Sequence, residues 1–303
     1  MTVSLRVWLA VSASVLVSVV VYARPAAPFG QAAGAAQASQ KPAPQGQSGQ
    51  APATPGPSAA EKQAYQDLVS EATAGLDLDR VVALAQDYEK KYPDSPMLSY
   101  VYSFEASANM GKGDYSKAVD ASQKSLKLNG DNLNSLLILA NMLPQPQLMQ
   151  GSDIDKQKRL DEAETDAKHA LDLINQGKIP KQPNETDDAY TKRKNAISSE
   201  PHASLGMVHL QRATMGLQGM DQDELAKAAQ EFKQSVEITD RPQPEHYYRL
   251  GEVYKHEKKI DDAIAAFSKA SELSQGTGLQ QYADKQVEEL KKMQTPAKPP
   301  ETH

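Results

Sequence analysis

Histidines and paired acidic residues are the side chains of this chain that could support metal binding or acid–base catalysis. His202 and His209 lie seven residues apart, which places them on one face of a helix. A helical zinc site uses closer spacing with an acidic neighbour, as in H-E-x-x-H, and no such motif is present. We therefore expect both histidines to pack against other helices rather than to bind a metal.

The acidic pairs Asp161-Glu162 and Asp261-Asp262 come at the expected starts of helices. Negative charge is favourable there because the helix dipole places partial positive charge at the amino terminus. The sequence has no phosphate-binding loop, no G-x-S-x-G motif, no dinucleotide fingerprint and no cysteine nucleophile. The prediction is a protein that is not an enzyme, with no cofactor, no catalytic residues and no metal site.

Composition favours an all-α fold. The chain has 303 residues, of which 39% are hydrophobic, and only 4 Phe and 1 Trp accompany its 12 Tyr and many alanines. Such a composition suits helices that pack through small residues better than sheets rich in aromatic and β-branched residues. A net charge of −6 gives no electrostatic basis for binding nucleic acid or an anionic membrane surface.

The first 23 residues resemble an export signal. Arg6 precedes an uncharged run over residues 7–23, which is short for a membrane span of about 20 residues. Val21 and Ala23 are small residues at the positions that matter for cleavage, and Ala38 offers a second cleavage site. We expect an exported protein of the periplasm or cell envelope.

The alternative is an uncleaved amino-terminal anchor, with Trp8 and Tyr22 at its two interfaces. Residues 24–60 are rich in Pro, Ala, Gln and Gly and lack Leu, Ile and Val, so we expect a disordered linker. Residues 295–303 are expected to form a flexible tail. Residues 61–294 are then the folded domain.

The segment over residues 247–270 has the spacing of a helical hairpin. Its expected first helix carries residues at i, i+3, i+4 and i+7, and its second helix carries residues at i, i+4 and i+7: Tyr247, Leu250, Gly251 and Tyr254, then Ala263, Phe267 and Ala270. The small residues Gly251 and Ala263 allow the two backbones to approach. A single hairpin buries too little apolar surface to fold alone, so it needs neighbours.

This order of residues resembles the tetratricopeptide repeat, whose period is about 34 residues. Similar spacing recurs four times upstream, at His202–Ser235, Leu136–Ala170, Ser99–Asn132 and Lys62–Ser95. The resemblance implies an α-solenoid of about five such hairpins, covered at its end by a helix over residues 279–294. In the second hairpin the polar residues Glu105, Asn109 and Ser122 depart from the pattern, so we expect its first helix to be less buried or shifted.

Residues 175–197 interrupt the period with two prolines and clustered charge. We expect an exposed insertion that ends in a helix leading into the fourth hairpin. It is either a tolerated surface insertion or a contact for a partner. A hydrolase or cofactor-binding site in this insertion is a further alternative.

The resemblance also implies a right-handed superhelix with a concave groove that binds peptides or proteins. The groove positions carried over from the family are Tyr100, Ser103, Ser107, Met110, Leu137, Asn141, Ala203, Met207, Leu210, Gln211, Tyr248, Glu252, Lys255 and His256. The family's clamp for a free carboxylate is not assembled, despite Asn141 and Arg249. We expect a non-catalytic interaction scaffold of the cell envelope whose partners are proteins or peptides; the alternative is a structural spacer without a peptide ligand. No nucleic acid is expected, and the membrane is involved only if the amino-terminal anchor is retained.

Overall fold

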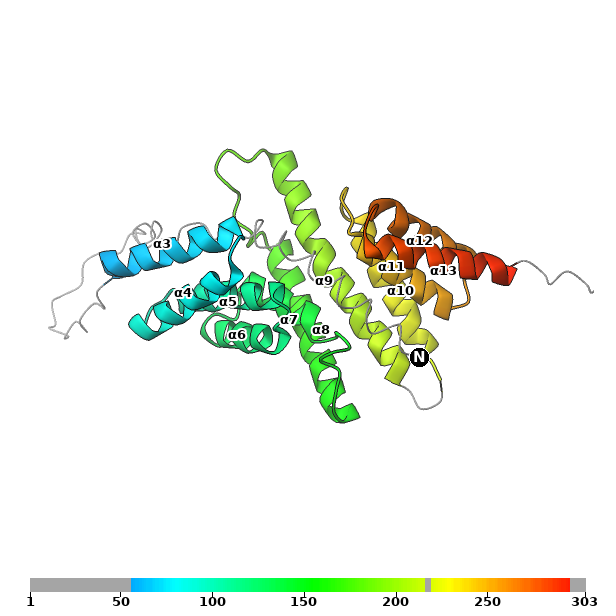
Figure 1. Ribbon diagram of the computed structural model, residues 1–303, viewed down its shortest axis with the longest axis horizontal. Coiled ribbons are helices and arrows are strands. Elements are labelled where there is room, and N and C mark those ends of the chain that lie inside the picture. The colour runs from blue at the N-terminus through cyan, green and yellow to red at the C-terminus, as the bar shows by residue number, and fades with distance from the viewer. Residues whose placement is uncertain (1–55, 216–218, 295–303) are drawn as a thin grey trace, which may run out of the picture.

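Successive helical hairpins make up the part of the chain that a computed structural model describes, residues 56–215 and 219–294 (Figure 1). The expected signal peptide, the linker up to residue 55 and the tail over residues 295–303 lie outside these ranges. Among the described residues, no helix has the length and apolar character needed to cross a membrane.

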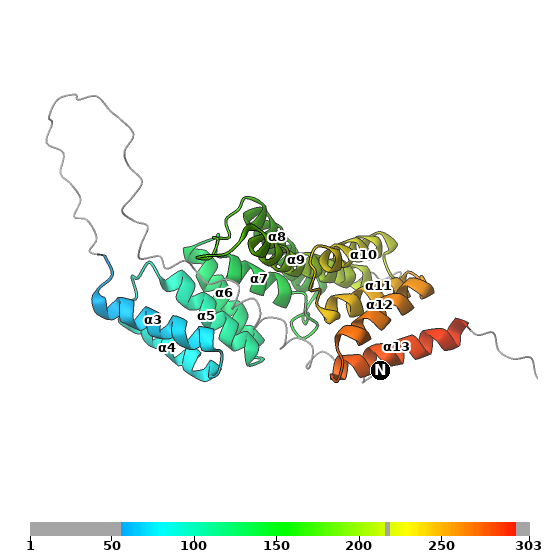
Figure 2. The ribbon, with the colours of Figure 1, turned by 90° about the horizontal axis from the view of Figure 1, so that it is seen from above.

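Each of the five expected hairpins is present. The first three are α3 (Ala59–Ala74) with α4 (Leu78–Lys91), α5 (Leu98–Gly111) with α6 (Tyr115–Leu128), and α7 (Leu133–Met142) with α8 (Asp153–Asn175). The last two are α9 (Asp187–Met215) with α10 (Gln222–Glu237), and α11 (Pro244–His256) with α12 (Ile260–Leu273), followed by α13 (Gly278–Gln294). Each helix packs against the next one in the chain, and Figure 2 shows the elongated stack from a second side. The predicted all-α solenoid with a carboxy-terminal covering helix is confirmed.

Side-chain caps define several helix starts. Ser58 accepts a hydrogen bond from the Glu61 amide of α3, and Asp77 does the same for the Arg80 amide of α4. At α8, Ser152 and Asp155 form a reciprocal capping box. These contacts satisfy amide groups that a helix start leaves without partners.

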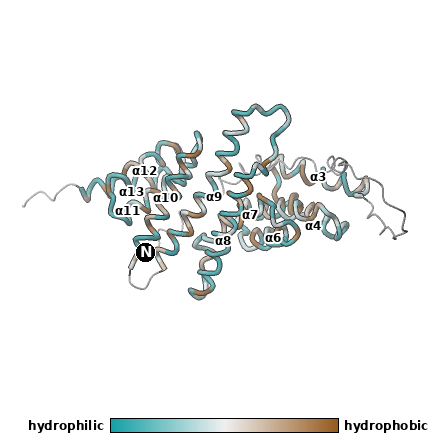
Figure 3. Tube along the Cα trace, turned by 180° about the vertical axis from the view of Figure 1, so that it is seen from behind, coloured by the Kyte–Doolittle hydropathy of each residue, from teal (hydrophilic) through white to brown (hydrophobic). Residues whose placement is uncertain are grey.

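Hydrophobic side chains recur along each helix at intervals that create one buried face. Figure 3 shows hydrophobic and hydrophilic residues alternating along the helical segments. In α10 the buried set has helical spacing: Leu225, Ala228, Ala229, Phe232, Ser235 and Val236. Burial of these faces between hairpins is the main stabilising contribution, at about 25 cal/mol per Å² of apolar surface.

Glycines bring the two helices of the last two hairpins close together. A Cβ atom at Gly251 would lie 2.9 Å from ring atoms of Phe267, and one at Gly206 would lie 2.8 Å from the ring of Phe232. In the third hairpin the equivalent positions hold Ala140 and Ala167, which are fully buried in one apolar cluster. Where the second helix carries phenylalanine, the first helix therefore carries glycine. Where the second helix carries alanine, the first helix also carries alanine.

Helix α5 is enclosed, so the expectation that its polar residues would leave it less buried or shifted is wrong. Glu105, Asn109 and Ser122 are 9%, 1% and 0% exposed. The physical reason is that α5 packs against α3, α4, α6 and α7. Glu105 accepts a hydrogen bond from Gln86 Nε2 at 3.2 Å, and burial raises the pKa of its carboxyl group.

Candidate partner-binding surface

Half of the predicted groove residues are buried in the cores between hairpins. These seven are Ser103, Met110, Leu137, Ala203, Met207, Leu210 and Tyr248, each 9% exposed or less. Met207 shares an apolar cluster with Leu250 and Val253 of the next hairpin. The first helix of a following hairpin therefore covers such positions, and their side chains support packing in this structure.

The other seven predicted groove residues are partly or fully exposed on the first helices of their hairpins. They are Tyr100, Ser107, Asn141, Gln211, Glu252, Lys255 and His256. They come from α5, α7, α9 and α11, so the stack places one or more of them on four successive hairpins. Their role in binding stays a prediction.

Several of these exposed side chains already have partners within the chain. Ser107 accepts a hydrogen bond from Asn134 Nδ2 at 3.0 Å, and Glu252 pairs with Arg249 Nη1 at 2.5 Å. Lys255 Nζ donates to Gln286 Oε1 of α13 at 2.6 Å. A partner that binds here would compete with short internal hydrogen bonds rather than meet bare polar groups.

Helix α13 covers the carboxy-terminal end of the stack. The rings of Tyr248 and Phe267 meet edge to face with centroids 5.1 Å apart, and Leu279, Ala283 and Leu290 of α13 belong to the same apolar cluster. This arrangement explains why Tyr248, expected in the groove, is 8% exposed.

The two suspect histidines lie in the interface between α9 and α10. His202 Nδ1 is 2.8 Å from Glu231 Oε2, and His209 Nδ1 is 2.7 Å from Glu224 Oε2. The partners were missed, although the sequence carries a signal: the glutamates are also seven residues apart, in the reverse order expected of antiparallel helices. Among the residues described by the structure, no three His, Cys, Asp or Glu side chains are grouped so that they could hold a metal ion.

The insertion over residues 175–197 is held against the fold. Arg193 Nε and Nη2 each lie 2.7 Å from the Glu185 carboxylate, and Nη2 also donates to the Pro180 carbonyl at 2.9 Å. Tyr190 donates to the carbonyl of Ile179, which is 5% exposed. The expectation of an exposed insertion therefore holds for its turns but not for Ile179, Arg193 or Ile197, which are buried. The helix expected at its end is present as the start of α9.

The Arg193 hydrogen bonds hold the pKa of the Glu185 carboxyl down at about 2. The carboxylate is therefore ionised at neutral pH. Glu185 and Arg193 are thus paired with each other, which fits a positioned surface segment better than a reactive site.

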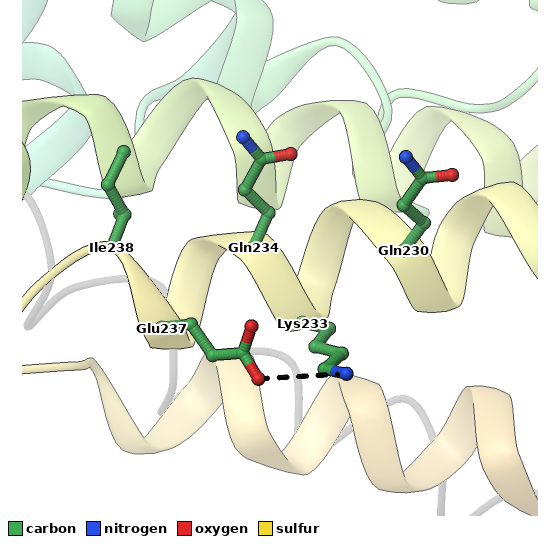
Figure 4. A pocket seen from close by; sticks show the side chains of 5 residues that line it. All are labelled: Gln230, Lys233, Gln234, Glu237 and Ile238. Carbon is green, nitrogen blue, oxygen red and sulfur yellow. Dashed lines mark ion pairs between the residues drawn. The ribbon is translucent and has the colours of Figure 1, made fainter.

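A hollow of about 400 Å³ lies along α10 (Figure 4). All of its lining residues come from α10 or its end: Gln230, Lys233, Gln234, Glu237 and Ile238. Lys233 Nζ lies 3.8 Å from Glu237 Oε1. The hollow is on a second helix and brings no groups from other elements together, so it is not the predicted groove.

Comparisons with known proteins agree with the hairpin architecture. Residues 245–277, which span α11 and α12, match the family model described as the tetratricopeptide repeat. Comparison with curated protein sequences gives no match.

Three solved structures are similar over most of the chain. An assembly chaperone of RpL4 is 12% identical, with 76% of this chain and 84% of that chain covered and a TM-score of 0.53. A thermophilic TPR protein of Thermus thermophilus is 18% identical, with 75% and 98% covered and a TM-score of 0.49. A tetratricopeptide repeat protein of Parabacteroides merdae is 14% identical, with 76% and 99% covered and a TM-score of 0.29.

At this level of identity the first of these similarities shows the fold alone. The family match is confined to the last hairpin, where the spacing of Tyr247, Gly251 and Phe267 is most complete. Residues 245–277 thus match the tetratricopeptide repeat, and the hairpins before them form a stack with the same helical-hairpin architecture.

Proposed function

We propose that this protein is a non-catalytic scaffold that binds peptide or protein partners along the first helices of its hairpins, in the cell envelope. The observation that carries the proposal is the placement of partly exposed polar and aromatic side chains on the first helices of four successive hairpins, such as Tyr100, Asn141, Gln211 and Glu252. Repeat proteins use extended surfaces of this kind because stacked units present equivalent positions side by side.

The chemistry of these positions suits a polar peptide surface. Asn141 and Gln211 carry amide groups that can both donate and accept hydrogen bonds, while Tyr100 offers an aromatic ring with a hydroxyl group. Glu252 and Lys255 add one charge of each sign. Several modest contacts distributed along the stack favour an extended partner over a small compact ligand.

A crosslinking experiment tests the surface. A photoreactive amino acid replaces Gln211 on α9 in one full-length variant and Gln234 on α10 in a matched control; Gln211 is partly exposed and Gln234 is exposed. After irradiation of native cells, we expect a crosslinked protein at position 211 and none at position 234. Equal crosslinking at both positions, or none at position 211, would contradict binding along the first helices.

The envelope location is tested separately. Sequencing of the mature amino terminus after cell fractionation should find Arg24 as the first residue in the exported fraction. A protein recovered with residues 1–23 in the membrane fraction would instead support the anchor, and a cytoplasmic protein would contradict export.

A further inference from the structure

Buried polar side chains join the fourth hairpin to the fifth. Ser199 and Glu200 of α9 and His246 of α11 are 2%, 6% and 5% exposed. Glu200 Oε2 lies 3.9 Å from His246 Nε2, and Ser199 Oγ lies 3.3 Å from His246 Nδ1. The contact therefore links two hairpins through groups that can gain or lose protons.

The hydrogen bonds of Ser199 restrict where His246 carries its proton. Ser199 has one hydroxyl hydrogen, which it donates to the Ser235 carbonyl at 2.7 Å. His246 Nδ1 must then be the donor to Ser199 Oγ, and in a neutral imidazole Nε2 is left as an acceptor. That acceptor faces Glu200 Oε2, an enclosed oxygen without a hydrogen-bond partner among the described residues.

A single proton shared by Glu200 and His246 allows Glu200 Oε2 and His246 Nε2 to attract each other. With a protonated carboxyl group an O–H faces the imidazole nitrogen, and with the proton on the imidazole the two residues form an ion pair. With no proton, two lone pairs and a buried negative charge face each other, which is strongly unfavourable in an apolar environment.

The surrounding groups oppose loss of that proton. Glu245 of α11 is a second carboxyl group that disfavours the ionised form of Glu200. Arg249 on the same helix lowers the pKa of Glu245, so it favours the charged form of that neighbour. From α10, the Ser235 carbonyl is occupied by Ser199, and Glu231 is engaged by His202.

We propose that the Glu200–His246 contact is a proton-dependent junction, which helps to dock α11–α13 on the fourth hairpin (α9 and α10) while the pair holds one proton and loosens when the pair loses it. This inference concerns the conformation of the stack and does not depend on the proposed scaffold function. A loosened junction would change the spacing between the partner-binding positions on α9 and those on α11.

The direction of the pH dependence follows from each group. Burial, reinforced by Glu245, raises the pKa of Glu200 to about 8, so its contribution to folding is fully present below about pH 4.5 and is lost as the pH rises through 8. Burial lowers the pKa of His246 to about 4, so its contribution is present above about pH 6.5 and is lost as the pH falls through 4. Within this pair, the change between pH 6.5 and 8.5 comes from Glu200.

Hydrogen exchange on the full chain, corrected for the intrinsic effect of pH, measures the junction. We expect protection of α11 to fall about tenfold between pH 6.5 and 8.5, while protection of α5 and α6 in the same molecules stays constant. Glu200→Gln keeps the shape and removes the ionisation, so it should abolish the fall. Glu237→Gln, at an exposed position on α10, is the matched control and should retain it.

Two results would overturn the proposal: the same pH dependence in Glu200→Gln as in the unmodified chain, or equal changes in α5 and α11. An independent measurement is the NMR titration of His246 in the unmodified chain, which is needed if Glu200→Gln fails to fold. We expect its imidazole to titrate near pH 4, and a titration near pH 6.5 would contradict the enclosed junction.

Discussion

Gly251→Ala tests the close contact between α11 and α12. The added Cβ would lie 2.9 Å from Cγ, Cδ1 and Cε1 of Phe267, whereas carbon atoms normally pack about 3.5–4.0 Å apart. Phe267 is 0% exposed, so its ring cannot move into solvent. The ring or the helix must shift by several tenths of an ångström in a packed core.

Overpacking of this size costs about 1–3 kcal/mol, and the better helix propensity of alanine offsets about 0.5–1 kcal/mol of it. We therefore expect the free energy of unfolding to fall by about 1–2 kcal/mol, measured by urea denaturation of the full chain. Gly130→Ala is the matched control, because nothing lies within 4 Å of a Cβ at that position. It should leave the free energy unchanged within about 0.5 kcal/mol.

A double-mutant cycle identifies the cause. Phe267→Ala alone should cost about 3–5 kcal/mol because it removes a fully buried ring. In that background Gly251→Ala should cost nothing or stabilise the chain, since the ring that it would meet is gone and the pair becomes Ala–Ala, as at Ala140 and Ala167. An equal cost of Gly251→Ala in both backgrounds would refute the proposed contact.

Two further predictions concern buried or fixed charges. Burial raises the pKa of Asp166 to about 7, and its Oδ2 has no hydrogen-bond partner among the described residues, so Asp166→Asn should raise the free energy of unfolding at pH 8 and leave it unchanged at pH 4; equal effects at both pH values in urea denaturation would contradict this. Arg193→Ala should release the loop before α9 and increase trypsin cleavage after Lys178 and Lys181 severalfold at pH 7. The unmodified chain should show increased cleavage only as the pH falls from about 4.5 toward 2, because Glu185 then gains its proton and loses its ion pair with Arg193. For the acid range an acid-active protease replaces trypsin, and unchanged cleavage of Arg193→Ala would contradict the role of this ion pair.

Hairpin spacing could be predicted from the sequence because it depends on local periodicity. Residues such as Leu250, Gly251 and Phe267 repeat at helical intervals, and the structure places them as expected. The burial of α5 could not be predicted in this way, since it depends on how many neighbours a helix has. Glu105 and Asn109 are polar yet enclosed because four other helices surround them.

The exposure of the groove residues was predicted less well than the hairpins. The repeat pattern places a residue within one hairpin but does not show which neighbouring helix covers it. Met207 and Tyr248 occupy positions that a single hairpin leaves open, but α11 and α13 supply the apolar residues that enclose them. Gln211 and Glu252 lie on the same helices and are partly exposed. Exposure along a first helix is thus decided by the following hairpin, which a one-repeat pattern cannot specify.

Comparison of equivalent positions in the fourth and fifth hairpins predicts the acidic part of the proposed junction. Glu200 and Glu245 are 45 residues apart, as are His202 and Tyr247, so the two glutamates occupy the same position of successive repeats. Equivalent positions of stacked repeats come close in space, so an acid at such a position can raise the pKa of its counterpart, as Glu245 does for Glu200. The position of His246 beside Glu245 then provides the acceptor that one shared proton can satisfy. A buried pair of this kind is recognisable from the sequence only when charges are compared between repeats rather than within one helix.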